Sequence, residues 1–209
     1  PISDRLLGGI ITTTNRARYY AIYCWILWHI GQTEPPTTES DFKEAFQRRE
    51  AAFAIGTVLD PEAKLSPIGV DLVRRKLGAC DDTVALDFAV LPSNPYGGFG
   101  ANYSGCMYAL GLWHRPTPLR EEVTEGAATS LALAVEATLA KTAFASKCLW
   151  RGASADLDDM RSSASALSLA AITRPLGAAE RVLVTNLLFG WEGRSEEHTS
   201  ELQSRQCIS

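Results

Sequence analysis

The stretch at residues 15–30 constrains the fold more than any other part of this sequence. It reads NRARYYAIYCWILWHI, and its apolar residues occupy nearly every face of a helix instead of a single stripe. A helix that is apolar all round is buried on all sides. Thr13, Thr14 or Asn15 is available to cap its start, and Gly31 marks its end. We therefore predict a central, buried helix around which the other elements pack.

The same stretch does not predict a membrane span or an export signal. It is shorter than the roughly 20 residues that cross a bilayer, and no small-x-small cleavage site follows it. Apart from Cys207, the cysteines lie far apart with no CxxC pair, which argues against a zinc ribbon and a disulfide framework: Cys24, Cys80, Cys106 and Cys148. We expect a cytoplasmic protein without membrane association, metal or cofactor.

Capping residues and apolar spacing predict further helices along the chain. These helices are expected at about residues 39–55, 66–77, 103–111, 124–141, 154–167 and 178–189. Residues 84–90 alternate apolar with small or charged side chains and form the one clear strand. The predicted fold is mainly α, a compact multi-helix domain with a small β element. It spans residues 1–193, either as one domain or as lobes at 1–111 and 112–193.

The C-terminal segment needs a separate interpretation. Residues 194–204 read RSEEHTSELQS, and their back-translation resembles read-through of a common sequencing adapter. We expect residues 194–209 to be a non-native, disordered tail, and the chain to be a fragment of a longer gene product.

Catalytic motifs are largely missing from the sequence. There is no HExxH, no phosphate-binding GxxxxGK[ST], no GxSxG and no GxGxxG. One rival class is a magnesium-dependent nuclease, for which Glu62-Ala-Lys64 supplies an ExK triplet and Asp41 lies upstream. Such enzymes carry the triplet on a core strand, whereas here it follows Pro61 in a predicted loop. We predict no catalytic residues and lean towards a protein that is not an enzyme.

Two arginines break a local rule. Arg16 and Arg18 fall in the first turn of the buried helix, where the helix dipole disfavours cations by about 0.3–1 kcal/mol. With the hydroxyl and amide groups before them, they form a combination suited to an anion such as phosphate. The alternative is an internal ion pair with Asp81, Asp82 or Glu50. The candidate anion or nucleic-acid site comprises Thr13, Thr14, Asn15, Arg16, Arg18, Arg74, Arg75 and Lys76.

Two predicted helix starts resemble the segment that often ends a winged-helix module. In residues 65–76 and 123–131, an apolar residue, a hydroxyl cap and a glycine precede an apolar helix. The first of these helices carries the basic run formed by Arg74, Arg75 and Lys76. The resemblance implies winged-helix-like lobes and a nucleic-acid contact.

The order of the elements resembles that of uncharacterised bacterial proteins from defence-type gene clusters. The segments that carry this resemblance are residues 14–28, 103–112, 124–126 and 180–190. It implies a bacterial, anti-phage setting and supplies no catalytic residues.

These observations predict a non-catalytic binding protein. Its partner is either the phosphates of a nucleic acid or a subunit that carries the catalysis. The alternatives are the magnesium-dependent nuclease and a purely structural scaffold. The net charge of −4 gives no general support to nucleic-acid binding, which usually comes with a basic surplus. A local basic patch would therefore have to supply it. The sequence predicts no oligomeric state.

Overall fold

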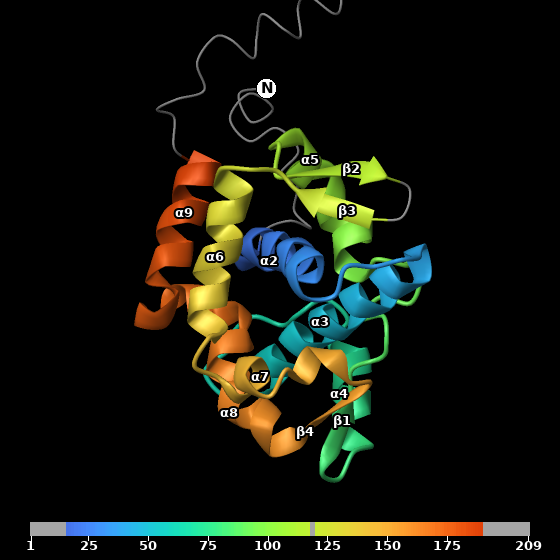
Figure 1. Ribbon diagram of the computed structural model, residues 1–209. Coiled ribbons are helices and arrows are strands. Elements are labelled where there is room, and N and C mark those ends of the chain that lie inside the picture. The colour runs from blue at the N-terminus through green and yellow to red at the C-terminus, as the bar shows by residue number, and fades with distance from the viewer. Residues whose placement is uncertain (1–15, 118–119, 190–209) are drawn as a thin grey trace, which may run out of the picture.

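The computed structural model describes residues 16–117 and 120–189, and it confirms a mainly α protein with a small β component (Figure 1). The longer helices are α2 (Arg18–Thr33), α3 (Glu39–Leu59), α4 (Val70–Gly78), α6 (Ala127–Leu139), α8 (Leu157–Leu167) and α9 (Ala178–Phe189). Shorter helical segments are η2 (Phe99–Tyr103), α5 (Ser104–Ala109), α7 (Ala143–Ser146), η3 (Leu149–Arg151), η4 (Leu169–Thr173) and η5 (Pro175–Gly177). Two antiparallel pairs complete the fold: β1 (Thr83–Ala85) with β4 (Ser154–Asp156), and β2 (Trp113–Thr117) with β3 (Arg120–Val123).

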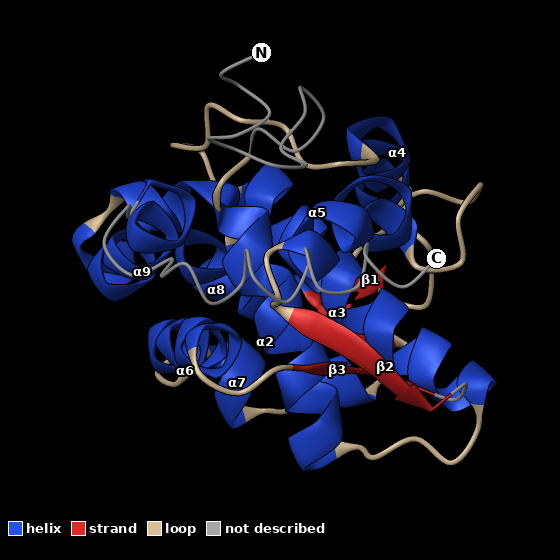
Figure 2. Ribbon diagram, turned by 90° about the horizontal axis from the view of Figure 1, so that it is seen from above, coloured by secondary structure: helices blue, strands red, loops and turns tan. Residues whose placement is uncertain are grey.

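Helix α2 occupies the centre of the molecule, as predicted. Its side chains are buried in an unbroken run from Arg18 to Leu27, and it packs against α3, α6, α9 and β3 (Figures 1 and 2). No side chain caps its start at Ala17. The proposed caps Thr13, Thr14 and Asn15 lie outside the described residues.

Helix α3 forms the second layer of the core. Thr38 and Asp41 close a capping box at its start, and the helix runs four residues beyond its predicted end. Gly56 lets α8 approach closely, because a Cβ atom there would overlap Leu167. One hydrophobic core holds residues from both sides of residue 112, since α2 packs against α6 and α3 against α8.

The structure corrects three predicted helix starts. Ser66 does not cap α4, which begins after Gly69 in a left-handed conformation with φ of 72°. The Thr124 hydroxyl donates to the Gly111 carbonyl, and α6 begins after Gly126. Ser154 lies in β4, and the cap of α8 is Asp156. The winged-helix resemblance rested on hydroxyl caps at the first two starts, so it loses its basis.

The strand content also differs from the prediction. Within residues 84–90 only the first two continue β1, because its partner β4 is three residues long. Leu86, Phe88 and Val90 stay buried beyond the end of β1, and the Leu86 amide donates one further hydrogen bond to the Ala153 carbonyl at 2.7 Å. Beyond Leu86 the alternation therefore reflects burial. The hairpin of β2 and β3 lies between the helices predicted at residues 103–111 and 124–141, where the sequence predicted no strand. Among the described residues, no helix combines the length and the apolar character needed to cross a membrane.

Candidate functional site

The predicted anion site is divided by the structure, because Arg18 points into the core. Its side chain is 1% exposed and forms two hydrogen bonds with the Glu180 carboxylate, at 2.8 and 3.0 Å. The remaining guanidinium nitrogen donates to the carbonyls of Ala166 and Ser168. Thr138 donates to the same carboxylate at 2.8 Å. Arg18 therefore has no contact left for an anion from solvent, and the internal ion pair explains its position.

This correction has a simple physical reason. A buried carboxylate can stabilise a guanidinium at a helix start in the same way as an anion from solvent, so the sequence pattern does not distinguish the two. The partner is Glu180 on α9, and not Asp81, Asp82 or Glu50. Thr13, Thr14 and Asn15, the other members of that half of the site, lie outside the described residues.

Arg16 is partly exposed, one turn before Tyr19, which contacts the chain that leads into α4. The Tyr19 hydroxyl accepts a hydrogen bond from the Ile68 amide at 2.8 Å, and the Tyr103 hydroxyl donates to the Arg16 carbonyl at 3.3 Å. Burial raises the pKa of Tyr19, and the nearby Arg16 guanidinium opposes that shift. Through Tyr19, the structure thus brings the partly exposed Arg16 towards the loop that leads into α4.

The basic run lies on the exposed face of α4, at the edge of the molecule in both views (Figures 1 and 2). Arg74 and Arg75 are exposed, and in the described part of the chain neither side chain has a hydrogen-bond or carboxylate partner. The Lys76 amine lies 5.4 Å from the centre of the Phe88 ring. Arg75 and Lys76 fall in the last turn, where the helix dipole favours cations. Their placement therefore stabilises the helix.

Many other arginines of the described chain are engaged by carboxylates. These pairs are Arg48 and Arg49 with Glu34, Arg115 with Glu39, Arg161 with Asp158, and Arg174 with Asp60. The α4 surface also carries acids, since Asp71, Asp81 and Asp82 are exposed at its two ends. The basic patch is therefore small: we define it as Arg74, Arg75 and Lys76.

The residues of the nuclease alternative do not come together. Asp41 caps the start of α3, whereas Glu62 and Lys64 follow its end. From Asp41 to the end of α3 at Leu59 the helix rises about 1.5 Å per residue, so roughly 27 Å of helix separates Asp41 from the loop that carries Glu62 and Lys64. Asp41 accepts hydrogen bonds from Thr37 and Thr38, which lower its pKa. The structure thus contradicts a site built on these three residues.

Neither described histidine lies in a ligand cluster. Nδ1 of His29 accepts a hydrogen bond from Nε of the buried Arg49 at 3.0 Å. Burial, and to a smaller extent the positive charge of Arg49, lowers the pKa of His29 to about 3. His114 lies on the surface, 3.9 Å from Glu122. Within residues 16–117 and 120–189 no group of three or more histidine, cysteine or acidic side chains could hold a metal ion.

Glu50 on α3, which the sequence suggested only as an ion-pair partner for an arginine, is a buried carboxyl group held by other contacts. It accepts hydrogen bonds from the Tyr23 hydroxyl and the Gly98 amide, both at 2.9 Å. Burial raises its pKa to about 7, and these hydrogen bonds oppose that shift. Among the described residues its other oxygen has no hydrogen-bond partner. The signal was present, because a spacing of four places Glu50 after Phe42 and Phe46 on the core face of α3.

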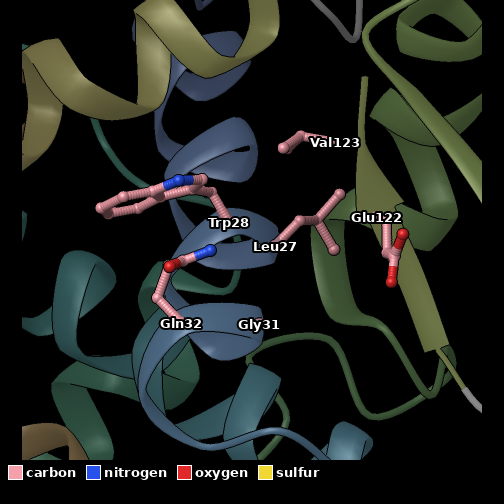
Figure 3. Close-up of a pocket in the computed structure, with 6 residues that line it drawn as sticks. All are labelled: Leu27, Trp28, Gly31, Gln32, Glu122 and Val123. Carbon is pink, nitrogen blue, oxygen red and sulfur yellow. The ribbon is translucent and has the colours of Figure 1, made fainter. Parts of the chain in front are cut away.

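A surface pocket of about 250 Å³ lies between α2 and β3. Figure 3 shows the side chains that line it, which are Leu27, Trp28, Gly31, Gln32, Glu122 and Val123. Its lining combines apolar side chains with one carboxylate and one amide. This combination can hold a small amphipathic group.

Comparisons with known proteins add no assignment to this geometry: no family model, curated protein or solved structure matches the chain.

Proposed function

We propose that this protein is a non-catalytic binding protein that contacts nucleic-acid phosphates through the basic patch of α4. The observation that carries the proposal is the lack of any described partner for Arg74 and Arg75, although many other arginines are paired. An exposed guanidinium without an internal acid can form bidentate hydrogen bonds with a phosphate.

The size of the patch sets the strength of this interaction. Three cations that neutralise three phosphates release few counterions. A plot of the logarithm of the association constant against the logarithm of the salt concentration should therefore have a slope of about −2.7. Such contacts hold a backbone and do not select a sequence. We therefore expect weak binding at physiological salt without sequence preference. The setting that fits this proposal is the bacterial defence-type system implied by the resemblance.

Fluorescence anisotropy with a labelled DNA duplex at low salt tests the proposal. The Arg74→Ala/Arg75→Ala variant should lose at least tenfold in affinity, because two phosphate contacts disappear. Arg151→Ala/Arg161→Ala is the matched control, since it removes two exposed arginines of α8 and η3 and changes the net charge equally. Equal losses in the two variants would show that only net charge matters, and would remove α4 as the site.

A second candidate function, docking to a catalytic partner subunit, is favoured by a different surface. Helices α6 and α9 lie side by side at one edge of the molecule (Figure 1). They expose Leu133, Val182 and Phe189, which are 50%, 57% and 68% exposed. Large exposed apolar side chains on neighbouring helices are typical of protein interfaces.

Replacement of this apolar surface separates the two candidates. If it binds a subunit encoded by a neighbouring gene, Leu133→Lys/Val182→Lys should abolish co-purification with that subunit, while Arg74→Ala/Arg75→Ala leaves it intact. The reverse result would favour the nucleic-acid proposal.

A further inference from the structure

We propose that the pocket between α2 and β3 binds the charged end of an alkylammonium group, such as a lysine side chain or a free primary amine. This inference concerns a different surface from α4 and does not depend on nucleic-acid binding. It rests on the shape of the pocket, on its one carboxylate and on a glycine that keeps it open.

The walls of the pocket suit a hydrocarbon stem. In Figure 3, Trp28 and Gln32 form one side of the pocket, and Leu27, Val123 and Glu122 form the other. Trp28 is partly exposed here, although its neighbours on α2 are buried. Long cationic side chains cover apolar surface with their methylene groups while the charged end stays polar. An indole ring also attracts an ammonium group that lies within about 6 Å of it.

Glu122 supplies the charge that an ammonium group requires. Its side chain is 34% exposed, and one of its oxygens lies 3.9 Å from the exposed His114. An ionised carboxylate has about four acceptor positions. Glu122 can therefore keep its existing contacts and still accept a hydrogen bond from a ligand. The Gln32 amide, on the opposite side, offers a second acceptor.

Gly31 leaves the pocket open. A Cβ atom at this position would meet nothing within 4 Å, although the residue lies inside a 16-residue helix. Glycine in a helix costs about 1 kcal/mol relative to alanine, and no close packing requires it here. A side chain at this position would instead occupy open space beside the pocket that Gly31 lines.

The volume limits the ligand to a group of side-chain size. Pockets that bury a drug-sized molecule hold about 300–1,000 Å³, whereas this one holds about 250 Å³. A butylammonium group fits this description, with its nitrogen at Glu122 and its methylene groups along Leu27 and Trp28.

The test is a titration of the full chain followed by NMR of the Trp28 indole N–H, assigned with Trp28→Phe. Butylammonium should give a saturable shift with a millimolar dissociation constant, and 1-butanol should bind at least fivefold more weakly. Glu122→Gln should weaken butylammonium two- to fivefold, the range expected for a partly exposed ion pair. Glu125→Gln, an exposed acid nearby, should not weaken it.

Occlusion of the pocket gives an independent readout. Gly31→Leu should abolish the shift, and Gly78→Leu is its control, because a Cβ atom there is also free of contacts.

Nα-acetyl-lysine amide then identifies the source of the cation: affinity equal to that of butylammonium indicates a protein side chain, and weaker binding indicates a free amine. Equal binding of 1-butanol and butylammonium, or an unchanged titration in folded Gly31→Leu, would overturn the proposal. Should Gly31→Leu fail to fold, the comparison of Glu122→Gln with Glu125→Gln decides.

Discussion

At the scale of single residues, the core contains ionisable groups whose pKa is shifted by burial. Glu50 is the clearest, because its carboxyl lies among aromatic rings beside Tyr23 and Gly98. Burial raises its pKa from 4.5 to about 7. The folded protein therefore keeps a proton on Glu50 at pH values where the unfolded chain has released it.

This shift predicts a pH-dependent stability. The stabilisation linked to the raised pKa is fully present below about pH 4.5 and is lost as the pH rises through 7. The Glu50→Gln side chain stays neutral at every pH, so this variant does not lose that stabilisation. Relative to the wild type, its free energy of unfolding should therefore rise between pH 5 and pH 8, by up to about 3 kcal/mol. Urea unfolding at both pH values measures this. The control is Glu44→Gln, an exposed acid of the same helix. Parallel pH profiles for Glu50→Gln and the wild type would contradict the shift.

The Arg18–Glu180 pair gives a second prediction at this scale. Replacement of either partner alone leaves a buried charge unpaired, which costs about 3–5 kcal/mol. We expect Arg18→Met/Glu180→Leu to be clearly more stable than the sum of the two single effects, as measured by urea unfolding. If the two effects simply add, the pair does not hold α2 to α9. A further consequence is that the folded double variant should keep its affinity for nucleic acid.

At the scale of elements, glycines in two helices have opposite roles. Gly31→Ala in α2 should stabilise the protein by up to about 1 kcal/mol, because the new methyl group meets no atom. Gly56→Ala in α3 gains the same helix propensity, but its methyl group would overlap Leu167 of α8. We expect it to destabilise the protein by about 1–3 kcal/mol. Thermal unfolding of both variants checks this, and shifts of the same sign would be inconsistent with the packing of α3 on α8.

Elements with a strong apolar period could be predicted from the sequence, while those fixed by backbone conformation could not. The predicted ranges for α2, α3 and α9 agree with the structure to within a few residues, because burial and helical period coincide there. The starts of α4 and α6 were placed at Ser66 and Thr124, but positive φ values at Gly69 and Gly126 decide them. Both glycines were read as part of a capping motif.

The candidate site was only partly predictable for a similar reason. The exposed α4 patch follows from the local sequence, because an amphipathic helix presents its basic residues to solvent. Arg18 looked like a surface group only while Glu180 was unknown as its partner. That pairing joins positions 162 residues apart, and no local pattern encodes such a contact.

At the scale of the whole molecule, charge separates the small basic patch from an otherwise acidic protein. The net charge is −4, so general attraction cannot explain an affinity for nucleic acid. In our proposal the affinity comes from the three cations of the α4 patch. The remaining described surface offers several arginines paired with carboxylates, the exposed Arg151, and exposed apolar side chains on α6 and α9.

The salt dependence of duplex DNA binding tests this account most directly. For the wild type, the logarithm of the association constant should fall with the logarithm of salt concentration with a slope near −2.7. Arg74→Ala/Arg75→Ala should reduce the magnitude of that slope by about 1.8, because each lost phosphate contact contributes about 0.9. An unchanged slope in this variant, or no measurable binding by the wild type at low salt, would contradict the proposal that α4 contacts phosphates.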